Sequence, residues 1–406
     1  MKTVQEAEEI VLTHCRKWGV EHVPFSKAVG RVLREPLCAD RDFPPFDRVA
    51  MDGIAMRFEA WRQGVHKFRI EGIQPAGAVP CRLQSTDGCI EIMTGAVLPE
   101  GADTVIPYEQ IELAGGYARV RDVEVRQGQN VHRQGLDRKK GEIIVEAGRS
   151  MTAAEIGIAA TVGKVYLVVS SLPRTAVIAT GDELVYVGEE PLPHQIRMSN
   201  IHQIAALLTG LCVQPELVHL ADNREALAMK LERCLADNEV CILSGGVSRG
   251  KFDFVPDVMA QCGVTWLCDK VKQRPGKPFW FGTAPGGKTI FALPGNPVST
   301  FACMHRYVLP WYRKTLGLEP LPQEFARLAS PFSTNSLLTF FLQVALQNAE
   351  GELLAVPVQG KGSGDLANLA DADAFIELPG NRTEYGRGEL FRVFRFRHHG
   401  GRYSEE

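Results

Sequence analysis

The sequence predicts a multidomain protein that combines a central doubly wound α/β domain with β-rich domains. Strand-like and helical segments alternate between residues 173 and 320, and short β-type runs lie on either side of them. The chain has 406 residues, more than the roughly 250 to 300 at which a single core stops growing. We expect four domains: a helical linker domain (residues 1–42 and 140–172), an inserted β-rich domain (43–139), an α/β domain (173–320) and a C-terminal β domain (321–398).

Two capping boxes frame the inserted domain. Thr3 with Glu6, and Thr152 with Glu155, have the spacing in which each side chain satisfies the backbone of the other at a helix start. Between these helices, short β-type runs such as residues 89–93 are broken by Pro and Gly. This pattern indicates a β-rich unit inserted between two helical ends.

The later segments show a change of periodicity. Expected strands and helices of the α/β domain alternate at residues 175–179, 200–211, 213–219, 224–235 and 240–243. After about residue 322 the helical periodicity disappears, and segments 340–346, 353–358 and 390–396 predict an all-β domain.

Composition excludes several classes of protein. Hydrophobic residues make up 45% and charged residues 23%, which is typical of a globular chain. The net charge of −3 gives no overall field that would attract nucleic acid or a membrane surface. The N-terminal residues lack a signal pattern and no run reaches the length of a membrane span, so we expect a cytoplasmic protein. Ten cysteines without a CxxC pair predict reduced thiols.

The residues that follow the expected strands are the candidates for a ligand site, because open parallel sheets bind ligands at the carboxyl ends of their strands. The turns in question are TGDE (180–183), SGGVSRG (244–250) with Asp253 beyond it, and PGNPVS (294–299). Asn296 suits an N-cap and Pro297 the first helical position. Each turn alone is more often a plain connection, but their convergence on one edge favours anion binding by backbone N–H groups.

Two familiar motifs are near matches at the second turn. Residues 245–252 fit a Walker A loop except that Phe252 replaces the magnesium-binding hydroxyl, so that interpretation fails. Residues 246–250 spell G-x-S-x-G, which would make Ser248 the nucleophile of an α/β-hydrolase. The downstream histidines, His305 just after the last strand and 398–399 in the tail, are poor candidates for the triad.

A cationic run precedes an aromatic strand. Lys272, Arg274 and Lys277 surround a Pro-Gly turn and flank residues 279–281, FWF. The ordinary interpretation is a solvated turn, but fixed backbone and clustered charge favour the binding of phosphate or an oxyanion. The inserted domain contains PPFD (44–47), AMDG (50–53), MTGA (93–96) and residues 128–137, which are turn sequences by composition and indicate no function.

Taken together, these strings resemble the molybdopterin molybdenumtransferase family, which includes the bacterial MoeA proteins and the E domain of gephyrin. Seven motifs occur in the family order along nearly the whole chain: PPFDRVAMDGIAMR, MTGA, GQNVHRQGLD, TGDEL, SGGVSRGKFD, RPGKP and LPGNPVS. The resemblance implies a MogA-like α/β domain and a barrel-like C-terminal domain. It further implies an elongated homodimer whose active cleft lies between the α/β domain of one subunit and the inserted domain of the other.

The resemblance also assigns a reaction and catalytic residues. The family inserts molybdenum from molybdate into adenylylated molybdopterin with Mg²⁺ and releases AMP. Asp52 and Thr94 would face the cleft from the inserted domain, and Glu183, Asp222 and Asp253 would be the cleft carboxylates that hold Mg²⁺. Implied protein partners are a molybdopterin adenylyltransferase and the enzymes that accept the cofactor.

A second implied set binds substrate or anion. Its members are Gly245, Gly246, Ser248, Lys272, Arg274, Lys277, Pro294, Asn296, Pro297, Ser363, His132 and Asp137. The chain departs from the family at His132 and Arg274, where arginine and lysine are usual, and at Gln343, near a position often held by arginine. A histidine is only partly charged at neutral pH, so we expect a weaker phosphate contact at His132.

The competing hypothesis is a catalytically silent scaffold or a specialised, tungstate-preferring paralogue, since the E domain of gephyrin also serves as an anchor. The carboxylates Asp52, Glu183, Asp222 and Asp253 argue against a scaffold, which has no physical need for mutually repelling charges around one cleft. Molybdate and tungstate have nearly the same size and charge, so the residues favour neither.

Overall fold

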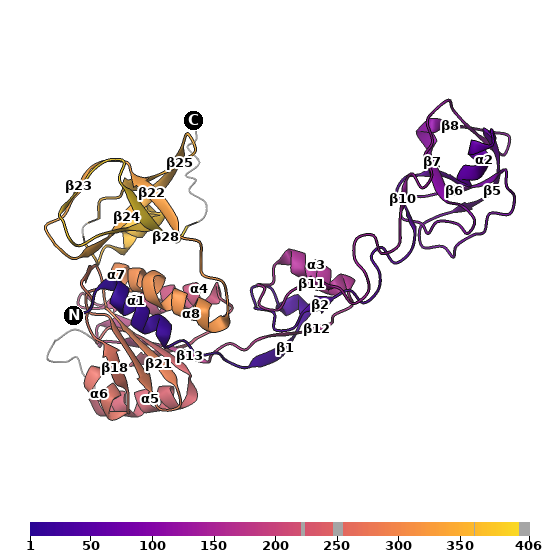
Figure 1. Cartoon of the computed structure of the whole chain (residues 1–406). Coiled ribbons are helices and arrows are strands. Elements are labelled where there is room, and N and C mark those ends of the chain that lie inside the picture. The colour runs from indigo at the N-terminus through magenta and orange to yellow at the C-terminus, as the bar shows by residue number, and fades with distance from the viewer. Residues whose placement is uncertain (221–223, 247–254, 361, 398–406) are drawn as a thin grey trace.

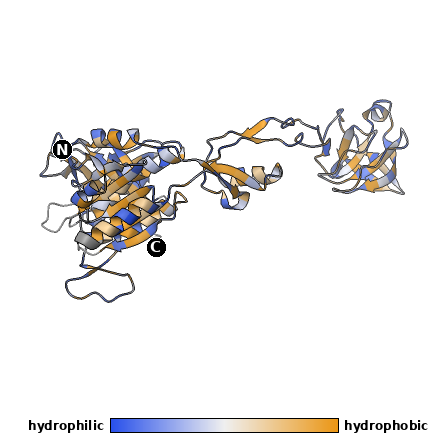
Figure 2. Ribbon diagram, turned by 90° about the horizontal axis from the view of Figure 1, so that it is seen from below, coloured by the Kyte–Doolittle hydropathy of each residue, from blue (hydrophilic) through white to orange (hydrophobic). Residues whose placement is uncertain are grey.

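The computed structural model describes residues 1–220, 224–246, 255–360 and 362–397. Figure 1 shows an elongated molecule with the inserted domain at one end, the α/β and C-terminal domains packed together at the other, and the linker domain between them. Hydrophobic residues concentrate on the sheets of the separate domains (Figure 2). In the described part of the chain, no helix is long and apolar enough to cross a membrane.

The α/β domain is built on a six-stranded sheet with the order β16-β13-β17-β21-β20-β18. Its strands are β13 (Thr175–Thr180), β16 (Glu216–Leu220), β17 (Val240–Ser244), β18 (Thr265–Cys268), β20 (Trp280–Ala284) and β21 (Lys288–Leu293). The first four strands in this order are parallel, as expected. β20 runs antiparallel to both β21 and β18. A tight turn at Gly286 and Gly287, both with positive φ, reverses the chain there.

Helices cover both faces of this sheet, which confirms the doubly wound prediction. One face carries α1 (Val4–Thr13), α4 (Asn200–Thr209), α7 (Pro297–Cys303), the π-helical turn η3 (Met304–Val308) and α8 (Leu309–Leu316). The other carries α5 (Arg224–Asp237) and α6 (Val255–Gln261). The expected boundaries place α1 in the linker domain, yet its buried residues Val4, Ala7 and Val11 pack in the α/β core against α8 and β18.

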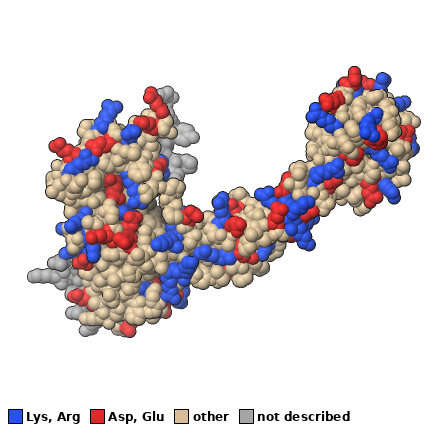
Figure 3. Space-filling model, viewed as in Figure 1, with Lys and Arg blue, Asp and Glu red and all other residues tan. Residues whose placement is uncertain are grey.

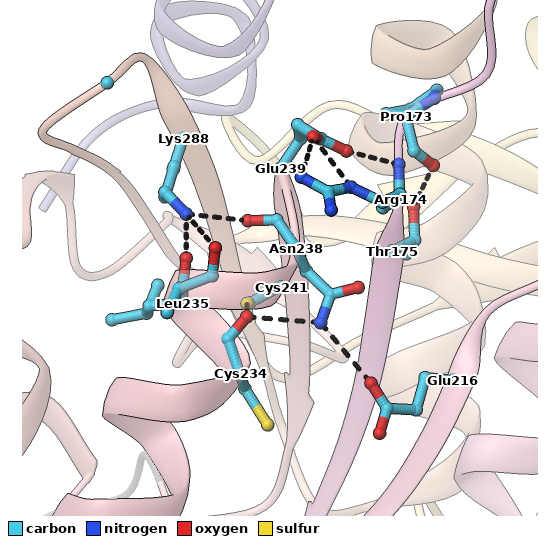
Figure 4. A network of polar contacts seen from close by, with 12 residues as sticks. Pro173, Arg174, Thr175, Glu216, Cys234, Leu235, Asn238, Glu239, Cys241 and Lys288 are labelled. Atoms are coloured by element: carbon cyan, nitrogen blue, oxygen red, sulfur yellow. Dashed lines mark hydrogen bonds and ion pairs between the residues drawn. The ribbon is translucent and has the colours of Figure 1, made fainter.

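The starts of the parallel strands are tied together by the polar network in Figure 4. Arg174 Nε and Nη2 donate to Glu239 Oε1 at 2.9 and 2.6 Å, which joins the start of β13 to the start of β17. Lys288 Nζ, at the start of β21, donates to three carbonyls at the end of α5, those of Leu235, Ala236 and Asn238. This network lies at the edge opposite the strand carboxyl ends, so its role is structural.

The linker domain consists of two ribbons and one α-helix. β1 (Val20–Pro24) pairs with β12 (Tyr166–Ser170), β2 (Leu37–Cys38) pairs with β11 (Ile143–Val145), and η1 (Phe25–Lys27) and α3 (Ala153–Thr161) complete it. Both predicted capping boxes, at Thr3 and Thr152, are confirmed. Arg34 Nη2 donates to the carbonyl of Leu316 at 3.0 Å, which fastens this domain to the end of α8.

The inserted domain contains a six-stranded sheet with the order β7-β4-β6-β5-β9-β8. Its elements are β3 (Arg48–Val49), β4 (Gly53–Met56), α2 (Phe58–Arg62), β5 (Lys67–Gln74), β6 (Gly88–Ile92), β7 (Thr104–Pro107), η2 (Tyr108–Gln110), β8 (Ile111–Ala114), β9 (Tyr117–Val120) and β10 (Val131–His132). The segments that enter and leave the domain meet at its base in an isolated antiparallel bridge, where Phe43 N donates to the Arg138 carbonyl at 2.8 Å.

The C-terminal domain is a five-stranded barrel, because β24 pairs with both β25 and β26 and so closes the sheet. Its elements are β22 (Glu324–Leu328), β23 (Phe332–Ser333), β24 (Thr339–Ala349), β25 (Glu352–Pro357), η4 (Leu366–Ala370), β26 (Ala374–Leu378), β27 (Glu384–Tyr385) and β28 (Leu390–Arg395). A short strand of the preceding domain, β19 (Gln273–Arg274), adds to β24 in parallel.

A buried ion cluster fixes the barrel on the α/β domain. Arg306 of η3 is 1% exposed. Its Nη2 donates to Glu8 Oε2 of α1 at 2.7 Å, its Nη1 lies 2.5 Å from Glu8 Oε1, and its Nε lies 3.3 Å from Glu377 Oε2 of β26. One guanidinium on η3 therefore joins α1 to the barrel.

Candidate active site

The four parallel strands end at one edge of the sheet, and glycines let their turns approach closely. Gly245 and Gly246 follow β17 with φ of +96° and +67°. A Cβ on Gly245 would lie 2.9 Å from the Thr180 carbonyl, and one on Gly246 would lie 2.7 Å from Thr180 Oγ1. Only glycine therefore fits at either position. The Thr180 hydroxyl is buried at the end of β13 and has no hydrogen-bond partner among the described residues.

Glu183 lies exposed on the turn that follows β13. Its carbonyl accepts from Ile196 N at 2.8 Å, because β14 (Leu184–Val185) and β15 (Ile196–Arg197) form a small ribbon beside it. The other two expected carboxylates, Asp222 and Asp253, and also Ser248, lie outside the described residues. Among the residues that are described, no group of three or more His, Cys, Asp or Glu side chains could hold a metal ion.

The turn after β21 connects the α/β domain to the barrel. Asn296 occupies the N-cap of α7 and Pro297 its first turn, as predicted. The Asn296 side chain makes no capping hydrogen bond to the helix, and its Nδ2 donates instead to Ser363 Oγ at 2.8 Å. Val298 N also donates to the Ser363 carbonyl at 3.2 Å. The structure thus brings the expected serine of the C-terminal domain onto the strand edge.

Asn200, at the start of α4, joins two of these turns and is absent from the sequence prediction. Its Nδ2 donates to Ser244 Oγ and to the Gly295 carbonyl, both at 2.8 Å. A Cβ on Gly295 would lie 3.7 Å from Gly245 Cα, so the two turns are in contact. The sequence offered one signal, a Ser-Asn pair before a helical pattern, which reads equally well as a plain helix start.

The cationic run belongs structurally to the barrel edge. Lys272, Arg274 and Lys277 are exposed, in agreement with both interpretations of the run. Arg274 Nη1 donates to Asn335 Oδ1 at 3.0 Å, and its guanidinium lies 5.9 Å from the ring centre of Phe340 on β24. The position of these charges therefore depends on the pairing of β19 with the barrel.

Asp52 and Thr94 form a pair at one end of the inserted sheet. Asp52 precedes β4 and Thr94 follows β6, and the register pairs Gly53 with Ile92, so the two residues meet. Asp52 Oδ1 accepts from both the hydroxyl and the backbone N–H of Thr94 at 2.6 Å. The hydroxyl first, and then the N–H, lower the pKa of Asp52. Asp52 is therefore an ionised acceptor at neutral pH.

The other motifs of the inserted domain contact one another. His132 Nε2 lies 2.8 Å from Asp137 Oδ1, so the structure joins these two expected anion-binding residues. Asp47 of the PPFD string accepts from Arg133 Nη1 at 2.6 Å and from Gln134 N at 2.8 Å. These contacts bring together two strings that lie nearly ninety residues apart in the sequence.

A single chain does not bring the two halves of the expected site together. In Figure 1 the inserted domain, in which Asp52 precedes β4 and Thr94 follows β6, lies at one end of the molecule, and the α/β domain, in which Glu183 follows β13, lies at the other. The space-filling view in Figure 3 shows open space between the barrel and the inserted domain, and Lys and Arg side chains gathered along the linker.

The fold and the glycine-rich strand edge define a multidomain protein built around a doubly wound α/β domain. Family models match in sequence order: the MoeA N-terminal region (domains I and II) over residues 2–163, a probable molybdopterin binding domain over 176–314, and the MoeA C-terminal region (domain IV) over 326–396.

Full-length relatives give the same result. The molybdopterin molybdenumtransferases of Synechocystis sp. and Bacillus subtilis are 37% and 31% identical over 96% of this chain, and over 99% and 93% of their own lengths. Two crystal structures of the molybdopterin biosynthesis MoeA protein from Pyrococcus horikoshii match with TM-scores of 0.82 and 0.81 at 30% and 27% identity. They cover 97% and 98% of this chain and 99% and 100% of their own. The chain belongs to the molybdopterin molybdenumtransferase family of molybdenum cofactor biosynthesis, a family of transferases.

Proposed function

We propose that this transferase inserts molybdenum from molybdate into adenylylated molybdopterin, in a Mg²⁺-dependent reaction that releases AMP. The observation that carries the proposal is that three elements, each of which we expect to bind anions, contact α7 or its N-cap. Its N-cap Asn296 binds Ser363, the preceding Gly295 contacts the Gly245 turn, and a Cβ on Gly276 of the cationic turn would lie 2.7 Å from Cys303 Sγ.

These elements suit an anionic substrate that carries phosphates and an oxyanion. Backbone N–H groups at glycine turns bind phosphate oxygens, and Lys272, Arg274 and Lys277 supply compensating charge. The proposed Mg²⁺ ligands are Glu183, Asp222 and Asp253, an all-oxygen set of the kind this ion prefers. When bound there, Mg²⁺ would neutralise charge between the carboxylates and the phosphates. The hydroxyl of Thr180, which makes no hydrogen bond within the described part of the chain, is a further oxygen at the same edge.

We propose that a second copy of the chain completes the site with its Asp52, Thr94, His132 and Asp137. The separation of the two halves within one chain supports this arrangement. Apolar side chains are exposed beside both halves, as expected for surfaces buried on association. Met51 and Leu136 are 41% and 68% exposed in the inserted domain, and Tyr186 and Ile196 are 59% and 58% exposed beside Glu183.

Mixing two inactive variants tests the shared site and the reaction together. Asp52→Ala and Glu183→Ala each remove one half, and we expect each purified variant to lose AMP release from adenylylated molybdopterin with molybdate and Mg²⁺. After subunit exchange, about half of the dimers are mixed and one of their two sites is intact, so about a quarter of wild-type activity should return.

The mixture has a matched control and clear contrary results. Mixing Asp52→Ala with Thr94→Ala, which damage the same half, should give no more activity than the two purified variants show on average by themselves. Failure of the first mixture to recover activity, despite proven subunit exchange, would place both halves of the site in one chain. Retention of AMP release by either single variant would remove that residue from the catalytic set, and a wild-type protein without AMP release would favour the scaffold hypothesis.

A further inference from the structure

The cationic turn is a closed loop with a polar residue facing inward. Val271 N donates to the Lys277 carbonyl at 3.0 Å, which closes the turn. Lys272 and Arg274 are exposed, whereas Gln273 between them is fully buried. This is the alternation of a β-strand, in which successive side chains point to opposite sides. The buried Gln273 therefore fixes the strand from which the side chains of Lys272 and Arg274 point outward.

Both ends of the Gln273 amide are occupied. Nε2 donates to the carbonyls of Pro275 and Gly276 at 3.2 and 3.1 Å, which are part of the same turn. Oε1 accepts from the hydroxyl of Tyr307. A buried amide costs free energy unless its hydrogen bonds are made, and these bonds are strong because water is excluded. An apolar side chain would fill the same volume without that cost, so packing alone does not account for Gln273.

Tyr307 ties this arrangement to the helical segment that begins at Asn296. It lies on η3, is 1% exposed, and stacks on Phe279 with ring centres 4.4 Å apart and planes at 27°. Gly276 leaves room for the contact, since a Cβ there would lie 2.7 Å from both Gln273 Nε2 and Cys303 Sγ. The helical segment that starts at the strand edge therefore continues into η3, where Tyr307 holds Gln273. Gln273 in turn holds the backbone of the cationic turn.

We propose that Gln273 and Tyr307 are positioning residues, which hold Lys272, Arg274 and Lys277 in the geometry that binds the oxyanion. The proposal rests on the proposed function of the cationic turn. Neither residue touches the substrate. Both act through the carbonyls of residues 275 and 276. Replacing either one therefore changes the direction in which the three cationic side chains point, but does not remove them.

The test measures the affinity of the full chain for inorganic molybdate by titration calorimetry, together with the melting temperature. Tyr307→Phe removes the hydroxyl that holds Gln273, and Gln273→Met keeps the volume but removes the amide. We expect each variant to bind molybdate about five- to tenfold more weakly, which is the effect on affinity of losing about one hydrogen bond. Should Tyr307→Phe fail to fold, Gln273→Met decides by the same measurement.

Tyr312→Phe is the matched control. Tyr312 is also fully buried, and its hydroxyl makes one hydrogen bond of 2.8 Å, to Thr175 Oγ1 at the start of β13, far from the strand carboxyl ends. We expect a melting temperature lowered as in Tyr307→Phe but unchanged molybdate affinity. An equal loss of affinity in Tyr312→Phe would show a general effect of destabilisation and overturn the proposal.

Lys277→Ala separates the inference from the function on which it rests. If this variant loses affinity while Tyr307→Phe and Gln273→Met bind molybdate like the wild type, the turn binds the anion but the buried pair does not position it. If Lys277→Ala binds molybdate with wild-type affinity, the cationic turn is not the oxyanion site and the positioning proposal is wrong, whereas AMP release tests the proposed reaction separately.

Discussion

Replacement of Arg306 by Met would test whether the barrel and the α/β domain act as one folding unit. The Arg306 side chain is 2% exposed and is shared by Glu8 and Glu377, whose side chains are 23% and 11% exposed. Removing one partner of a buried ion pair costs about 3 to 5 kcal/mol, because the remaining charges stay desolvated and unpaired. We expect about 3 kcal/mol, the lower end, since Glu8 retains partial contact with water and with Arg392 at 4.0 Å.

The assay combines denaturant unfolding, followed by tryptophan fluorescence, with hydrogen exchange of peptides from the barrel. Arg306→Met should unfold at lower denaturant and exchange faster in β26 and β28 than in the α/β sheet. Arg395→Met is the control, because the pair of Arg395 with Glu324 is partly exposed and should contribute less than about 1 kcal/mol. A loss below about 1 kcal/mol in Arg306→Met, with unchanged exchange in the barrel, would refute the role given to this cluster.

Three further predictions follow from single contacts. Gly53→Ala should misfold the inserted domain, because a Cβ would clash with a backbone carbonyl of β7; native-like proteolysis of that domain would contradict this. Thr94→Val should move the acid limb of the pH–activity profile to higher pH, since the hydroxyl that lowers the pKa of Asp52 is lost. An unmoved limb would show that the ionisation of Asp52 does not control activity. Burial raises the pKa of Glu239 but the Arg174 hydrogen bonds lower it further, so its stabilisation is present above the unfolded pKa and lost in acid. Glu239→Gln should therefore be less stable than wild type at pH 7, with a difference that shrinks below about pH 4 and KM unchanged.

Local features of the fold could be predicted from the sequence because their causes are local. The capping boxes at Thr3 and Thr152 need only residues three positions apart, and both are confirmed. The antiparallel strands β18 and β20, the packing of α1 in the α/β core and the addition of β19 to the barrel depend on pairings between distant segments. No periodicity within a short window carries that information.

The candidate site shows the same division. The convergence of the turns at Gly245 and Asn296 was predictable, because parallel strands bring their carboxyl ends to one edge. The roles of Asn200 and Gln273 could not be predicted from the sequence. A polar residue between Lys272 and Arg274 has the composition of a solvated turn, and only its burial distinguishes it from one. The position of Asn296 at a helix start was predictable, but its contact with Ser363 was not. Ser363 lies more than sixty residues later in the sequence.

The hydrogen bonds between residues 43 and 138 at the base of the inserted domain make that domain separable by genetic means. Phe43 N donates to the Arg138 carbonyl at 2.8 Å and Arg138 N donates back at 3.1 Å, so the chain leaves and re-enters at nearly one point. A two-residue turn could bridge this point in place of the intervening segment, since paired antiparallel strands need no longer connection. The same junction would accept the corresponding segment of a relative, so recombination at these two positions could exchange one half of the active site and leave the other intact.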